Sequence, residues 1–156
     1  MEDQEKKVWR LISKLDVCML STLSGNSIRS RPMSAMARPE YGDIVMLTDS
    51  HLDKDNEIMR NRHVNLAYSD GGTYVSVEGT AEIEHDRALI RECWSAGAQL
   101  FWPNGPEDPS IVAIIVTPEM VEYWDSDNKF IAGLKFAYGL ATHTTPFMGE
   151  HKRLRL

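Results

Sequence analysis

Residues 26–54 read NSIRSRPMSAMARPEYGDIVMLTDSHLDK, and they predict two strands joined by a turn. The first strand is an extended arm over 27–37, the turn covers 39–43, and the second strand covers 44–47. Arg29 and Arg31 fall on one face of the arm, because strand side chains alternate between two faces. Pairing across the turn would bring Arg31 near Thr48, with Lys54 in the loop that follows.

Such a group of side chains suits a phosphate, because arginine offers a planar fork of donors and lysine a mobile charge. A phosphate there would also meet unpaired amides at the start of the next expected helix. The alternative is an ordinary edge strand whose two arginines are solvated. Pro32 indicates a sheet edge, a bulge or a close approach by another group, because proline cannot donate a ladder hydrogen bond.

The bulk properties predict one soluble globular domain. The chain has 156 residues, of which 42% are hydrophobic and 26% charged, with a formal net charge of −6. The acidic balance argues against nucleic-acid binding, so a local cationic patch would serve a small anion better than a polymer. The acidic start lacks a signal-peptide core and no apolar run would span a bilayer, so we expect a cytoplasmic protein without membrane contact. Cys18 and Cys93 are read as reduced core thiols, and the alternative is one disulfide between them.

Periodicity predicts a mainly β protein with added helices. The expected elements are a helix at 3–15, strands at 17–23, 27–37, 44–47, 64–69, 73–84, 111–116 and 120–125, and helices at 55–62 and 87–97. The helix at 3–15 carries one apolar stripe, and the nearly apolar strand at 17–23 is expected to be buried. Ile58 and Met59 are expected to face inward, Asp86 is the candidate cap of the helix at 87–97, and Gly79 predicts a bulge or a close backbone approach. Six or seven strands with frequent turns favour a small antiparallel barrel in a single domain, 1–156. Residues 126–156 form a C-terminal extension, with a helix near 134–140 and a loose, solvated basic tail.

Motifs for specific chemistry are missing from the sequence. It contains no P-loop, GxGxxG, HExxH, CxxC or GxSxG pattern. The five histidines lack the spacing of metal ligands, so we expect no metal site. Nothing isolates a catalytic acid or base.

Several segments together resemble a known family. They are Ser30-Arg31-Pro32-Met33, Leu47-Thr48-Asp49, Lys54, Tyr74-Val75-Ser76-Val77-Glu78-Gly79-Thr80-Ala81, Phe101-Trp102-Pro103-Asn104-Gly105, Asp108-Pro109 and Glu122-Tyr123-Trp124-Asp125. In this order they resemble the pyridoxamine 5'-phosphate oxidase-like flavoproteins, and the later segments narrow the resemblance to the bacterial general stress protein branch. The resemblance covers residues 15–125. It implies a split β-barrel homodimer that binds FMN at the subunit interface.

The resemblance also implies roles for individual residues. Arg31 and Lys54 would hold the FMN phosphate, and Trp124 would approach the cofactor from the partner subunit. Trp102 would cover the cavity from its loop. Pro32 and Met33 would line the isoalloxazine ring, Leu47 and Thr48 would lie beside the ring and the ribityl chain, and Ser76 would make a polar contact from the long strand. The full set of implied cofactor-binding residues is Arg31, Pro32, Met33, Leu47, Thr48, Asp49, Lys54, Ser76, Trp102 and Trp124.

Two departures from the family pattern affect the expected activity. The oxidase has a basic substrate-binding segment after its C-terminal tryptophan, whereas here the chain reads Asp125-Ser126-Asp127-Asn128-Lys129-Phe130. We therefore do not expect oxidation of pyridoxamine phosphate. Met36 replaces a second cation of the phosphate strand, which predicts a weaker grip on the phosphate.

The functional expectation is an FMN-dependent oxidoreductase of unknown substrate, linked to the stress response. One alternative is a non-catalytic flavin-binding or sensor protein with the same site. Another is a split barrel that binds deazaflavin F420 or haem.

Overall fold

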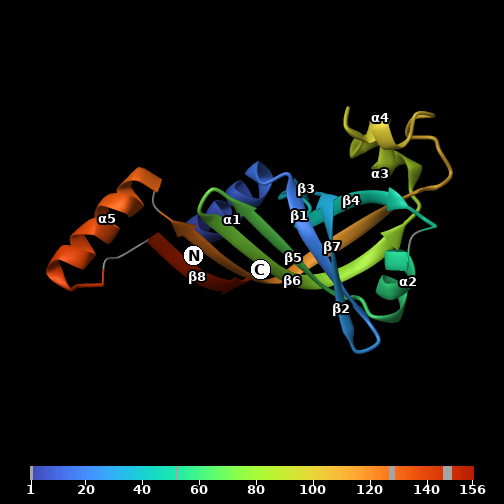
Figure 1. The fold of residues 1–156 in the computed structure, drawn as a ribbon. Helices are drawn as coiled ribbons and strands as arrows, with labels where there is room; N and C mark the ends of the chain where they lie inside the picture. Colours follow the sequence, from blue (N-terminus) through green and yellow to red (C-terminus); the bar gives the residue numbers. More distant parts are fainter. Residues whose placement is uncertain (1, 52, 127–128, 146–148) are drawn as a thin grey trace.

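The computed structural model describes residues 2–51, 53–126, 129–145 and 149–156. Within these residues the strands form one antiparallel sheet in the order β2-β1-β5-β6-β7-β4-β3, and β8 also pairs with β7 (Figure 1). The strands are β1 (Val17–Ser24), β2 (Ser27–Ser34), β3 (Met36–Arg38), β4 (Asp43–Asp49), β5 (His63–Asp70), β6 (Thr73–Glu84), β7 (Ile111–Ser126) and β8 (Gly149–Arg155). The helices are α1 (Glu2–Lys14), α2 (Asp53–Arg60), α3 (Arg87–Glu92), α4 (Ala98–Phe101) and α5 (Lys129–Thr142). A mainly antiparallel sheet with a few helices is consistent with the expected split barrel.

The inner face of the sheet carries the main core. Leu20, Leu66 and Val77 lie opposite one another on β1, β5 and β6, and all three are fully buried. Helix α1 packs Val8 and Ile12 into the same cluster. This matches the apolar stripe expected at 3–15, because residues three or four apart lie on one helix face.

A second, smaller core lies at the end of the molecule that carries α3 and α4 (Figure 1). Leu89 and Ile90 of α3 pack there with Val45 of β4 and Ile111 of β7. Asp86 caps α3 as expected, since its carboxylate accepts a hydrogen bond of 2.9 Å from the Ala88 amide.

The positions of Pro32 and Gly79 in the sheet agree with what the sequence predicts for them. Pro32 lies in β2, which is the edge strand and pairs with β1 in unbroken register. The register of β6 against β7 shifts between Glu78 and Gly79, so a bulge occurs there. A Cβ atom at Gly79 would collide with the backbone carbonyl of Thr117, which explains why glycine is needed.

The structure corrects four expectations about the elements. The strands expected at 111–116 and 120–125 are one continuous strand, β7, and α3 ends at Glu92 instead of continuing to 97. The basic tail is not loose, because residues 149–155 form β8 along β7, and the sheet of the described chain therefore has eight strands. Met59 of α2 was expected to face inward with Ile58, but it is 74% exposed.

Cys18 and Cys93 are free and buried, as expected of core thiols. Burial raises the pKa of Cys18 to about 11. Among the described helices, none combines the length and apolar character that crossing a membrane would require.

Candidate functional site

The side chains of the arginine arm alternate between the two faces of the sheet. Arg31 pairs in register with Leu20 of β1, so it lies on the inner face with Arg29 and Met33. Pro32 points to the opposite, outer face. Met33 packs against the main core, while Pro32 is exposed.

A partly buried polar cluster contains the Arg31 guanidinium, and we call Arg29, Arg31, Thr22 and Glu57 the arginine cluster. Arg31 Nη1 donates to Thr22 Oγ1 at 2.6 Å, and Arg31 Nη2 donates to Glu57 Oε2 at 2.8 Å. Arg29 Nη1 lies 3.2 Å from the other carboxylate oxygen, Glu57 Oε1. Thr22 Oγ1 donates to Glu57 Oε2. One carboxylate of α2 thus joins both arginines of β2.

Glu57 is ionised in this environment. Burial by itself would raise the pKa of its carboxyl group. Hydrogen bonds from Thr22 and Arg31, together with the charges of Arg31 and Arg29, outweigh burial and hold the pKa below its ordinary value. The cluster therefore carries two guanidinium charges and one carboxylate charge, and its net charge is positive.

Helix α2 supplies the second part of the expected phosphate site. It begins at Asp53, so Lys54 lies in its first turn, where backbone amides lack helical partners. The side chain of Lys54 lies outside the described side chains. Glu57, which is 6% exposed, follows three residues after Lys54. The same short helix therefore carries both the expected phosphate lysine and the carboxylate that binds Arg31.

Strand β4 holds the residues expected beside the ribityl chain and ring. The structure corrects the expected pairing of the arm: it is divided into β2 and β3, and β4 pairs only with β3, over Met36–Arg38. Arg31 therefore does not pair with Thr48 across the turn, and its hydrogen-bond partners lie on β1 and α2. Thr48 is buried opposite Val112 of β7. Leu47 packs against the second core, and Asp49 Oδ1 accepts a hydrogen bond of 2.8 Å from the His51 amide.

Three of the predicted cofactor-binding residues share the outer face of the sheet. Pro32 of β2 pairs with Met19 of β1, which pairs with Ala67 of β5, and Ala67 pairs with Ser76 of β6. Trp124 of β7 lies on the same face as this row. Ser76 Oγ accepts a hydrogen bond of 2.8 Å from Asn65, and the Trp124 ring stacks on His151 at a centroid distance of 5.0 Å. The sheet of one chain therefore separates these side chains from the arginine cluster.

Trp102 lies directly after α4 and is half-buried. Its ring centroid is 6.3 Å from that of Trp94 and 6.1 Å from that of Phe101. Trp102 and Trp94 pack against the second core, whereas Phe101 is 78% exposed.

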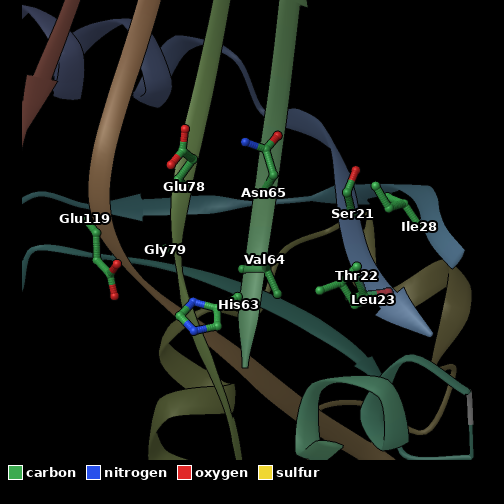
Figure 2. A pocket seen from close by; sticks show the side chains of 10 residues that line it. All are labelled: Ser21, Thr22, Leu23, Ile28, His63, Val64, Asn65, Glu78, Gly79 and Glu119. Atoms are coloured by element: carbon green, nitrogen blue, oxygen red, sulfur yellow. The ribbon is translucent and has the colours of Figure 1, made fainter. Parts of the chain in front are cut away.

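Two surface hollows lie apart from the predicted cofactor residues. The first, of about 270 Å³, is seen in Figure 2, which labels its lining side chains from β1, β2, β5, β6 and β7. It includes Thr22 of the arginine cluster, and His63, Glu78 and Glu119 at its rim. The second, of about 530 Å³, lies between α1 and Pro39. The described residues contain no group of three or more side chains that could hold a metal ion.

Sequence reasoning missed Glu57 and Thr22. Thr22 was expected only as part of a buried strand, and Glu57 only as part of a helix. The available signal was the position of Glu57 directly before the inward-facing Ile58, which places a carboxylate at the edge of the buried helix face. A buried carboxylate requires a partner, but this signal does not identify which cation supplies it.

Comparisons with known proteins agree with this architecture. The sequence profile of the family described as "Pyridoxamine 5'-phosphate oxidase like" matches residues 3–146. General stress protein 26 of Bacillus subtilis is 25% identical over 135 residues, which is 82% of this chain and 93% of that protein. Protein bli-3 of Neurospora crassa is 30% identical over 109 residues, 62% of this chain, and the match spans only 52% of bli-3.

Solved structures show the same fold. A crystal structure assigned to general stress protein 26 from a Jannaschia species superposes with a TM-score of 0.83 at 26% identity, covering 100% of both chains. The general stress FMN/FAD binding protein of Xanthomonas citri superposes with a TM-score of 0.72, covering 82% of this chain and 93% of that chain. The latter is 18% identical, so it adds evidence about the fold.

Proposed function

Because the chain belongs to the pyridoxamine 5'-phosphate oxidase-like family, we propose that it binds FMN and holds the phosphate beside the arginine cluster. The observation that carries this proposal is the placement of Arg29 and Arg31 on an edge strand, clamped to the helix that begins at Asp53. FMN carries a phosphate close to doubly negative, and such a group binds best to charge-assisted donors. Structural neighbours described as FMN/FAD binding support the choice of a flavin.

The donor set of Arg31 fits a phosphate. A guanidinium has five N–H groups, and three of them are used in hydrogen bonds to Leu20, Thr22 and Glu57. Two remain for a ligand within the described part of the chain, and the Arg31 side chain is 23% exposed. Lys54 and the first amides of α2 would add charge and donors on the other side of the phosphate.

The predicted cofactor residues on the outer face support a second copy of the chain in the site. Pro32, Ser76 and Trp124 lie on the outer face, away from the inner face that holds Arg31. We infer a homodimer in which the partner's outer face meets the flavin held by this chain. The bound flavin would supply the electron transfer of an oxidoreductase whose substrate is still to be found.

An absorbance spectrum of the purified protein tests the cofactor. We expect flavin bands, or their appearance after incubation with FMN, and deazaflavin and haem would give different bands. Bleaching of the bound flavin by NAD(P)H without oxygen would separate an oxidoreductase from a non-catalytic flavin binder. A colourless sample that takes up no FMN would count against the proposal.

Substitution of the phosphate residues tests the placement. We expect Arg31→Ala combined with Lys54→Ala to weaken FMN binding by at least about tenfold while the fold is kept, because each charge-assisted donor contributes about 1.5–3 kcal/mol. Fluorescence titration with FMN measures the affinity, and circular dichroism checks the fold. Arg62→Ala, which removes an exposed guanidinium paired with Glu82, is the matched control. Unchanged affinity in the double variant would show that the phosphate lies elsewhere.

A further inference from the structure

We propose that Glu57 is a positioning residue, which holds the Arg31 guanidinium so that its outer edge faces an anionic ligand. This proposal rests on the proposed function, because the ligand concerned is the FMN phosphate. Glu57 does not touch the ligand in this arrangement. It acts through Arg31, and it ties strand β2 to helix α2.

The geometry of the carboxylate supports a clamp. Both oxygens of Glu57 are used, because Oε2 accepts from Arg31 and Thr22 while Oε1 accepts from Arg29. The side chain is 7% exposed, so water offers little competition for these contacts. Glu57 lies one turn beyond the start of α2, and the clamp therefore fixes the distance between that helix start and the arm.

The orientation of Arg31 shows which part of its guanidinium is left for a ligand. Nη1 is directed to Thr22 Oγ1 and the Leu20 carbonyl, both on β1, and Nη2 is directed to Glu57. These contacts use both Nη1 hydrogens and one Nη2 hydrogen, which leaves Nε–H and the second Nη2 hydrogen without a partner in the described part of the chain. A ligand that approaches from solvent would meet the remaining N–H groups, so Glu57 and a phosphate can bind the same arginine together.

Charge gives a second reason for the clamp. Arg29 and Arg31 project from the same face of one strand and repel each other. Glu57 bridges them and keeps both near the start of α2. Without the carboxylate, Arg31 would keep Thr22 and Leu20 as partners but lose the charged contact that fixes its second nitrogen.

The test compares FMN with riboflavin, which lacks the phosphate. The ratio of the riboflavin Kd to the FMN Kd isolates the phosphate contribution, and fluorescence titration gives both constants. For Glu57→Ala we expect this ratio to fall by about tenfold or more, since a charged hydrogen-bond network is lost. The riboflavin Kd should stay within about twofold, because the ring contacts are untouched. For Glu57→Gln the ratio should lie between the values for Glu57→Ala and the wild type, because the glutamine amide oxygen still accepts a hydrogen bond.

Two controls separate positioning from a general loss of structure. Glu82→Gln removes the carboxylate of an exposed ion pair with Arg62 and should leave the ratio unchanged. In an Arg31→Ala background, Glu57→Ala should no longer change the ratio, because the residue through which it acts is gone. A merely structural role for Glu57 would change both Kd values alike in either background.

The outcomes are distinct. If the ratio of the riboflavin Kd to the FMN Kd in Glu57→Ala stays within about twofold of the wild-type ratio, the proposal is overturned. A ratio above that of the wild type would also overturn it, because it would show that Glu57 competes with the phosphate. If Glu57→Ala does not fold, Glu57→Gln decides: a fall of at least about threefold supports positioning, and anything less overturns it. If the wild type binds neither flavin, the proposed function itself fails, whereas flavin binding with an unchanged ratio overturns only the role of Glu57.

Discussion

Glu57 is 6% exposed, yet its carboxylate is ionised beside two guanidinium groups. Its pKa in the folded protein lies below the ordinary value of 4.5 that it regains on unfolding. A group with a depressed folded pKa stabilises the protein above its unfolded pKa, and this contribution disappears as the pH falls through the folded pKa. Glu57 should therefore contribute at neutral pH and cease to contribute in acid.

We predict that Glu57→Gln lowers the free energy of unfolding by about 1–3 kcal/mol near pH 7, because charged hydrogen bonds are lost from a buried site. The difference between variant and wild type should shrink well below pH 4.5, where the wild-type carboxyl group also becomes neutral. Urea unfolding of the variant and the wild type at a series of pH values measures this free-energy difference and how it changes with pH. A difference that stays constant from neutral to acid pH would show that the Glu57 charge does not stabilise the fold.

Part of the arginine cluster could be predicted from sequence. Strand alternation correctly placed Arg29 and Arg31 on one face. Pro32 indicated an edge, a bulge or a close approach, and the structure places it on an edge strand. The partners could not be predicted in the same way, because Thr22 and Glu57 come from other elements. Which of many carboxylates meets an arginine depends on how α2 is laid against β1, and local sequence does not encode that arrangement.

Strand β8 depends on contacts that are remote in sequence. Glu150 accepts hydrogen bonds from Lys7 of α1 at 2.5 Å and from the Tyr123 hydroxyl of β7 at 2.8 Å. The chain enters β8 at Gly149, whose φ of +132° and close contact with β7 exclude a side chain. A Cβ atom there would lie 2.5 Å from the Asp125 carbonyl oxygen.

We predict that Gly149→Ala detaches the start of β8 from β7, because both the backbone strain and the clash oppose pairing. Hydrogen exchange should show protection of the amides in 150–155 falling by at least about tenfold, while the amides of β5 and β6 keep theirs. Gly133→Ala in α5 is the matched control, since a Cβ atom there meets nothing within 4 Å. Equal protection in both variants would show that β8 tolerates a side chain at its first position.

Elements with strong local patterns were predictable, and those set by distant partners were not. The hairpin β5–β6 follows from its alternating strands and from Gly71 and Gly72, which both have positive φ. The segment that forms β8 has a polar, basic sequence, which is typical of a solvated tail. It becomes a strand because the long β7 offers an edge beyond the point where β4 ends its pairing.

At the scale of the whole molecule, one chain leaves apolar side chains uncovered. Figure 1 shows α5 at the opposite end of the sheet from α3 and α4, and Leu134, Phe136, Tyr138 and Leu140 of α5 are exposed. On the outer face of the sheet, Val17, Met19, Tyr74 and Trp124 are exposed as well. Exposed apolar surface of this extent is typical of proteins that associate. The outer face also holds Pro32 and Ser76, so association and flavin binding should depend on the same surface.

We therefore predict that Met19→Glu prevents formation of the proposed dimer and weakens FMN binding together with it. Met19 lies between Pro32 and Ala67 in the register of the outer face, and a buried, unpaired carboxylate would cost several kcal/mol at an interface. Light scattering after size exclusion measures the mass, and fluorescence titration measures FMN binding. Tyr41→Glu, an exposed aromatic at the β3–β4 turn, should remain a dimer with wild-type affinity. If Met19→Glu stays dimeric and binds FMN normally, the partner does not cover this face. The outer-face residues would then have to reach the flavin within a single chain, which the separation of the two faces by the sheet argues against.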